Sequence, residues 1–131
     1  EKEMGAAISG HMTQPVSNLV GKDTLLQLLA TLQRATVLIT PDSGPAHMAT
    51  AVGTPVIGLY AATNPARSGP YVSREWCVNQ YEAACQKILG KSASQAAWTS
   101  KIEAAGVMDL IKPEEVIQKL RQLLAAKTSR S

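Results

Sequence analysis

Residues Thr36 to Tyr60 decide the fold, and they read Thr-Val-Leu-Ile-Thr-Pro-Asp-Ser-Gly-Pro-Ala-His-Met-Ala-Thr-Ala-Val-Gly-Thr-Pro-Val-Ile-Gly-Leu-Tyr. The pattern predicts a buried strand over 37–40, a tight turn, a helix of small residues over 45–52 and a second buried strand over 56–60. Alternating buried strands and short helices predict an α/β fold, with a parallel sheet covered by helices on both faces.

Three more helices are expected outside this stretch. One covers 24–35 with Asp23 as its N-cap, one covers 82–89 and ends at Gly90, and one covers 113–126. The apolar face of the last helix comprises Val116, Ile117, Leu120, Leu123 and Leu124. A tail over 127–131 is expected to fray.

The remaining segments give weaker signals. A short strand is expected over 18–20, a Gly- and Pro-rich loop over 61–73, and a polar excursion over 91–106 with Trp98 as its anchor. Three other aromatic residues are interpreted as packing anchors rather than stacking platforms: Trp76, Tyr71 and Tyr81.

The chain opens inside a helical pattern over 1–9 without an N-cap ahead of it. We therefore expect residues 1–131 to form a single domain that is a fragment of a longer, two-domain protein. Its formal net charge of +3 is small and scattered, and it gives no indication of nucleic acid binding. No run approaches the roughly 18 apolar residues of a membrane span. Cys77 and Cys85 form no CxxC pattern, so we expect reduced, intracellular cysteines and no structural zinc site.

The turn between the two predicted strands has the chemistry of an anion site. Ser43 and Gly44 open a helix, whose first N–H groups have no intrahelical partner and whose dipole favours negative charge. Gly44 lets a phosphate approach the backbone because it has no Cβ. His47, one turn later, can donate to a phosphate that gains charge. The structural alternatives are a simple N-cap for Ser43 and a hydrogen-bonded structural role for His47.

Asp42 is expected to support this site by accepting backbone N–H bonds in the turn, because its charge repels a phosphate. A hydrolase is excluded as an interpretation, since the sequence has no GxSxG elbow and closeness alone does not activate a hydroxyl. Arg67 is a candidate anion contact, although a solvated loop arginine is the simpler interpretation.

Three motifs occur in order over 18–71: Asn-Leu-Val-Gly-Lys-Asp-Thr-Leu, Asp-Ser-Gly-Pro-Ala-His, and Gly-Thr-Pro-Val-Ile-Gly-Leu-Tyr followed by Thr-Asn-Pro and Gly-Pro-Tyr. They resemble the heptosyltransferases of lipopolysaccharide core synthesis, which form glycosyltransferase family 9. The resemblance implies the C-terminal half of a GT-B fold, a Rossmann-like domain that binds ADP-heptose. It places Ser43, Gly44 and His47 at the diphosphate, Asp42 at the motif aspartate, and Gly21 and Lys22 at the adenine pocket.

The resemblance also implies a lipopolysaccharide core acceptor, no cofactor, no obligatory metal and a location at the cytoplasmic face of the inner membrane in a Gram-negative bacterium. Peripheral membrane association fits that location. The catalytic base would be an aspartate of the absent N-terminal domain, so the isolated fragment is expected to be inactive. Asn64 departs from the usual aspartate before proline. Two alternatives stay open: a nucleotide-binding module without turnover, and a GT-B relative that uses another nucleotide sugar.

Overall fold

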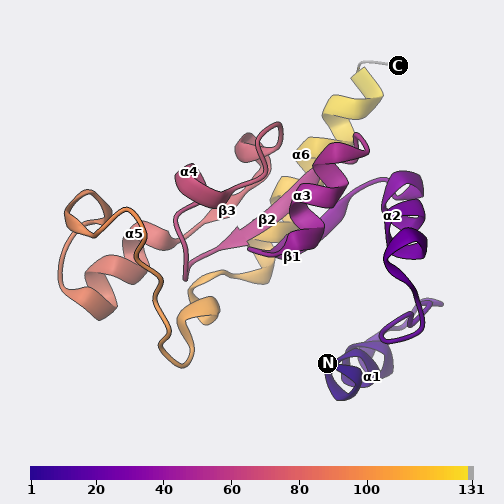
Figure 1. Ribbon diagram of the computed structural model, residues 1–131, viewed down its shortest axis with the longest axis horizontal. Helices are drawn as coiled ribbons and strands as arrows, with labels where there is room; N and C mark the ends of the chain where they lie inside the picture. Colours follow the sequence, from indigo (N-terminus) through magenta and orange to yellow (C-terminus); the bar gives the residue numbers. More distant parts are fainter. Residues whose placement is uncertain (130–131) are drawn as a thin grey trace.

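The computed structural model describes residues 1–129, and within them the centre is a three-stranded parallel sheet in the order β1-β2-β3. Its strands are β1 (Leu38–Pro41), β2 (Val56–Tyr60) and β3 (Val78–Asn79). Figure 1 shows them side by side in the middle of the molecule. The predicted α/β class and parallel sheet are confirmed.

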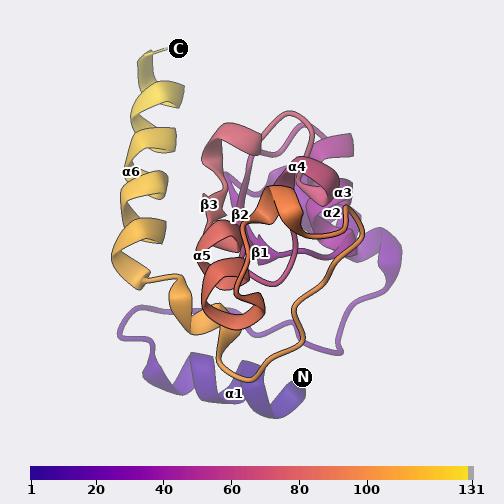
Figure 2. The ribbon, with the colours of Figure 1, turned by 90° about the vertical axis from the view of Figure 1, so that its left-hand side faces the viewer.

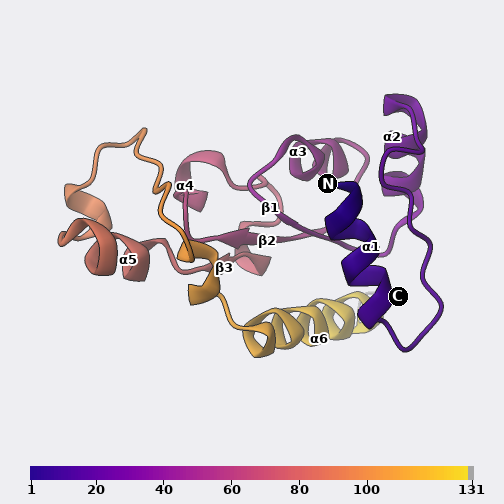
Figure 3. The same cartoon turned by 90° about the horizontal axis from the view of Figure 1, so that it is seen from below.

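Helices cover both faces of the sheet, because successive residues of β2 point to opposite sides. Val56 is fully buried against the cluster that includes helix α3 (Gly44–Ala51). Ile57 is fully buried on the other face, where it packs with Leu123 of helix α6 (Pro113–Ser129). Figure 3 shows α3 and α6 on opposite sides of the strands.

Helix α2 (Leu25–Arg34) packs on α3 and brings Leu32 into the same core. The expected N-cap, Asp23, is wrong by one residue. The Thr24 hydroxyl accepts a hydrogen bond from the Gln27 N–H at 3.2 Å, and the Gln27 side chain accepts one from the Thr24 N–H at 2.8 Å. This reciprocal box needs a Thr-x-x-Gln spacing, which starts at Thr24 and not at Asp23.

Helix α6 is longer than predicted and buries a narrower face. It continues to Ser129, because the Thr128 and Ser129 hydroxyls donate to carbonyls four residues earlier. The rest of the predicted tail, residues 130 and 131, lies outside the described residues. Ile117 and Leu124 are exposed, contrary to prediction, because they lie outside the face of α6 that packs against β2, the two-residue strand β3 and their neighbours. The face that packs against the sheet comprises Val116, Leu120 and Leu123.

The segment after β2 contains short helices. The predicted loop over 61–73 holds α4 (Pro65–Ser68), and a 3-10 turn (Arg74–Trp76) follows it. The helix predicted over 82–89 is present as α5 (Tyr81–Ala84) and a π-helical turn (Cys85–Leu89). It ends at Gly90, whose φ of +67° suits a residue without a Cβ.

Two of the predicted aromatic anchors are wrong. Trp98 is 62% exposed, and the buried residue of its segment is Ile102, whose N–H donates to the Ala62 carbonyl at 2.8 Å. Tyr71 is 79% exposed, and its ring lies at the surface 5.6 Å from the Arg74 guanidinium carbon. The other two anchors are confirmed, since Tyr81 is buried and Trp76 packs against the core under α6.

Helix α1 (Lys2–His11) confirms the predicted N-terminal helix, but it buries none of its residues. It lies apart from the sheet in Figure 1, and Figure 2 shows the same separation. The strand expected over 18–20 is wrong. The Asn18 side chain accepts a hydrogen bond from the Val20 N–H at 3.1 Å, and the Lys22 N–H donates to the Leu19 carbonyl at 2.9 Å, so the chain turns there.

Candidate functional site

The turn from β1 into α3 leaves the start of the helix open. Ser43 is the N-cap residue, but its side chain makes no capping hydrogen bond. Instead its Oγ shares a hydrogen bond with the Thr40 Oγ1 at 2.9 Å. The simple N-cap interpretation is therefore right about the position and wrong about the bond. The Gly44 N–H makes no hydrogen bond within residues 1–129 and stays available to a ligand. Pro45 has no N–H, and the Ala46 N–H donates to the Ser43 carbonyl at 3.2 Å.

Gly44 and His47 both lie at the surface of this helix start. A Cβ built on Gly44 would meet no atom within 4 Å, so the space in front of its backbone is open. The His47 side chain is exposed and makes no hydrogen bond within residues 1–129. The structural interpretation of His47 as a hydrogen-bonded residue is therefore wrong. Its ring nitrogens are free to donate to an anion.

Asp42 supports the site in a different way from the one predicted. Its Oδ2 accepts a hydrogen bond from the Ser68 hydroxyl of α4 at 2.8 Å, in place of the expected backbone N–H bonds. The Ser68 carbonyl in turn accepts a hydrogen bond from the Tyr60 hydroxyl at 3.3 Å. Burial, with the Asp42 charge second, raises the pKa of Tyr60 well above its ordinary value, so this hydroxyl stays a neutral donor. Asp42 thus ties the turn to α4.

A cavity of about 430 Å³ lies on one side of the turn and reaches the predicted adenine pocket. Gly21, with a φ of +72°, and Pro45 of α3 both line it. The Lys22 side chain is exposed and is not part of the wall. The structure therefore brings the Gly21 turn and the start of α3 to one cavity and leaves the Lys22 side chain outside it, while the adenine role of both residues stays a prediction. The walls comprise Glu1, Leu19, Val20, Gly21, Asp23, Leu28, Thr31 and Pro45.

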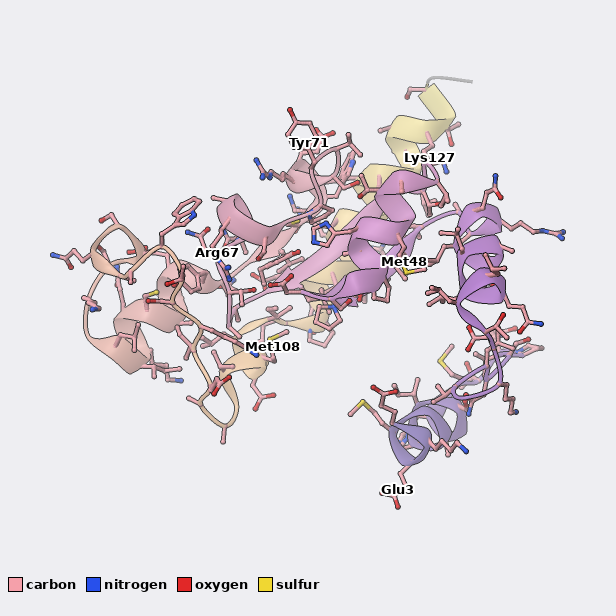
Figure 4. All side chains as sticks on the ribbon, in the orientation of Figure 1. Glu3, Met48, Arg67, Tyr71, Met108 and Lys127 are labelled. Atoms are coloured by element: carbon pink, nitrogen blue, oxygen red, sulfur yellow. The ribbon has the colours of Figure 1, made fainter. Side chains whose placement is uncertain are left out.

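A second cavity, of about 220 Å³, lies at the carboxyl ends of β1 and β2. Its walls comprise Pro41, Asp42, Leu59, Ala62, Thr63, Arg67, Lys101 and Met108. Figure 4 shows the labelled Arg67 and Met108 at this end of the sheet. Arg67 is half-buried, so its interpretation as a solvated loop arginine is wrong. Lys101 and Met108 come from segments far along the chain, and no local pattern pointed to them.

Asn64 has a structural role that was not predicted. Its Oδ1 accepts a hydrogen bond from the Ala66 N–H at 3.0 Å and so caps α4. Asparagine is as good a cap as aspartate, so α4 is capped with asparagine at this position. None of the helices within residues 1–129 has the length and apolar character of a membrane span. Nor do those residues gather three or more potential metal-binding side chains of His, Cys, Asp or Glu.

The sequence matches the family described as "Glycosyltransferase family 9 (heptosyltransferase)" over residues 1–99. It is 43% identical over 107 residues to the lipopolysaccharide core heptosyltransferase OpsX of Haemophilus influenzae, which covers 82% of this chain and 31% of the relative. It is 28% identical over 124 residues to lipooligosaccharide heptosyltransferase 2 of the same species, covering 95% of this chain and 34% of that protein.

A shorter match is stronger in identity. Over 55 residues the chain is 47% identical to lipopolysaccharide heptosyltransferase 3 of Escherichia coli. This alignment covers 42% of this chain and 16% of the relative. The chain thus spans at most about a third of the length of these relatives. The comparison with solved structures gives no significant match.

Proposed function

The chain belongs to glycosyltransferase family 9, and on that premise we propose that it is the donor-binding domain of a heptosyltransferase. The whole protein would transfer heptose from ADP-heptose to a lipopolysaccharide core acceptor. The names of the relatives support heptose transfer in this pathway. We place the reaction at the cytoplasmic face of the inner membrane, where a nucleotide sugar and a membrane-bound acceptor can meet.

The observation that carries the proposal is the uncapped start of α3 beside a cavity. The Ser43 hydroxyl turns to Thr40 and leaves the Gly44 N–H open for a diphosphate, while the Ala46 N–H donates to the Ser43 carbonyl at 3.2 Å. The adjoining cavity of about 430 Å³ joins Pro45 to the Gly21 turn and offers room for the nucleoside. A diphosphate at the helix start and an adenosine in this cavity would form one continuous ligand.

His47 has the geometry for work on the leaving group. When an acceptor hydroxyl displaces ADP, negative charge grows on the phosphate oxygens that were bonded to the sugar. His47 lies one turn into α3 with its ring exposed and without a hydrogen bond among the described residues, so it can donate to those oxygens. The base that deprotonates the acceptor is the aspartate that the family resemblance places in the N-terminal domain.

The test is an NMR titration of the ¹⁵N-labelled chain with ADP and with ADP-heptose. The amides of Ser43, Gly44 and Ala46 should shift, because they surround the helix start. Gly44→Ala should weaken ADP binding by about tenfold or more, because a Cβ stands where the phosphate approaches the backbone. Gly10→Ala is the matched control, since a Cβ there also meets no atom within 4 Å and lies on α1.

Millimolar ADP that leaves these amides unmoved would refute the donor-binding proposal. Binding alone does not establish transfer. A full-length protein that binds ADP but transfers no heptose would instead be the nucleotide-binding module that remains as the alternative.

A further inference from the structure

The cavity of about 220 Å³ on the other side of the 41–44 turn carries an excess of positive charge. Arg67 and Lys101 contribute cations, and Asp42 contributes one carboxylate. The Ser68 hydroxyl that donates to this carboxylate at 2.8 Å is neutral, so Asp42 keeps its negative charge and the three groups sum to one positive charge. Lys101 pairs with Glu103 at 3.5 Å, but their side chains are 60% and 76% exposed, so solvent screens the pair. Arg67 is the half-buried cation of this wall, and it forms no ion pair within residues 1–129.

The position of the Arg67 guanidinium is unusual. Its Nε is buried and has no hydrogen-bond partner within residues 1–129, and in the same part of the chain the side chain forms no ion pair. Buried donors in folded proteins nearly always have a partner, so an unpartnered Nε in a residue of the cavity wall indicates a side chain that rearranges to complete its hydrogen bonds when a ligand binds. A guanidinium presents a planar fork of donors that matches the oxygens of a phosphate or carboxylate.

A second donor faces the same space. Thr63 lines the cavity, and within the described residues its hydroxyl makes no hydrogen bond. The cavity also lies at the carboxyl ends of parallel strands, which is where α/β sheets bind ligands. Pro41 and Asp42 line this cavity, while Pro45 lines the one that we assign to the nucleotide, so the same turn has a ligand-sized space on each side.

We propose that this cavity binds an oxyanion, a phosphate or carboxylate, carried by the acceptor sugar, with Arg67 as its main ligand and Thr63 as a second donor. The assignment to the acceptor rests on the proposed function, because a transfer needs a second substrate beside the diphosphate. The oxyanion site itself stands on Arg67 and the cavity alone.

The experiment follows the Arg67 Nε–H resonance of the ¹⁵N-labelled chain during a titration with inorganic phosphate. This resonance and the Thr63 amide should shift. Arg67→Lys keeps the charge but removes the fork and the buried N–H, and it should weaken phosphate binding by about tenfold. Arg34→Lys is the matched control, since Arg34 is exposed at the end of α2, and it should bind like the unmodified chain. An unmoved Arg67 resonance, or equal binding by Arg67→Lys, overturns the proposal.

A repeat in saturating ADP separates this proposal from the donor-binding one. Phosphate that still shifts Arg67 supports two separate sites. If ADP abolishes the shift, the cavity is part of the donor site, and the acceptor assignment fails while donor binding stands. If ADP leaves the 43–46 amides unmoved while phosphate shifts Arg67, donor binding fails and the oxyanion site stands. Glucose 6-phosphate and glucuronate then identify the group, and at least one of them must bind better than glucose for the proposal to survive.

Discussion

Two turns at the same end of the sheet have similar sequences, but only one of them caps the helix that follows it. Pro-Asp-Ser-Gly-Pro leads from β1 into α3, and Ala-Thr-Asn-Pro leads from β2 into α4. In each, an N-cap residue precedes a proline at the start of a helix. Asn64 caps its helix, whereas Ser43 does not. Four residues after the cap, Ser68 is hydrogen-bonded to the rest of the fold, whereas His47 is exposed and unpaired among the described residues.

The difference indicates which turn holds the structure and which one serves a ligand. The α4 turn satisfies its own polar groups, and through Ser68 it also holds Asp42 in place. The α3 turn sends its capping hydroxyl back to Thr40 and keeps the Gly44 N–H open. A turn whose polar groups are hydrogen-bonded within the protein contributes stability, and a turn that leaves a donor without a partner can bind a ligand there. Substitutions in the two turns should therefore change different measured quantities.

The largest effect is expected from His47→Ala in the full-length protein. Removing a donor that acts on the leaving phosphate should lower the turnover number by about a hundredfold while donor affinity changes much less. Steady-state kinetics with ADP-heptose measures both quantities. His11→Ala is the control, because His11 is exposed on α1 and bonds only to the carbonyl of its own helix. An unchanged turnover number would remove His47 from the mechanism.

The next effect comes from giving the α3 turn a capping side chain. Ser43→Asn cannot repeat the Asn64 cap, because the matching residue Pro45 has no N–H, but its longer side chain can accept from the Ala46 N–H and fill the space in front of Gly44 that we assign to the ligand. ADP affinity should then fall by about tenfold, as for one lost charge-assisted hydrogen bond. The free energy of unfolding should change little, because the new cap offsets the lost hydrogen bond between Ser43 and the buried Thr40. Calorimetric titration and urea unfolding measure the two quantities.

Asn64→Ala removes the cap of the α4 turn. It should lower the free energy of unfolding by about 1 kcal/mol through the lost cap, and it should leave ADP affinity unchanged. If Ser43→Asn bound ADP as tightly as the unmodified chain, the uncapped helix start would not be the ligand site.

The sequence predicts the α3 turn well because its signals are local. Apolar strands, Pro45 after Ser43, and Gly53 after the helix all act within 25 residues, and they agree with one another. The order of the motifs indicated the family, which the comparisons confirm. The roles of Ser43, Gly44 and His47 toward a donor stay predictions.

The rest depends on residues that only the tertiary fold brings together. Asp42 and Ser68 are 26 positions apart, and neither shows in sequence that it will bond to the other. Helix α4 has four residues, which is too short to show a helical period, so its Asn-Pro start resembled a loop. Trp98 resembled an anchor by its size, but the backbone bond to Ala62 placed Ile102 in the core instead.

The smallest expected effect is a fall in the free energy of unfolding at high pH. Measuring it tests whether Tyr60 helps to join the two turns. Tyr60 donates to Ser68, and its pKa is raised by burial and then by the Asp42 charge. The folded state therefore keeps the Tyr60 proton at a pH where the unfolded state has released it. The contribution to stability is complete below about pH 10 and is lost as the pH rises from there toward the folded pKa. Unfolding free energies measured by urea at neutral pH and near pH 10.5 should show this fall.

Tyr60→Phe removes the Tyr60 share of the decline and should flatten the curve above about pH 10. Some decline will remain, because burial also raises the pKa of Tyr81 and of Cys77. Tyr71→Phe is the control, since Tyr71 is exposed, and its curve should follow that of the unmodified chain. Asp42→Asn should leave the decline in place but bring its upper end to lower pH, because it removes the charge that ranks second among the causes. A Tyr60→Phe curve identical to that of the unmodified chain would mean that Tyr60 does not join the α4 turn to Asp42 through its neutral hydroxyl.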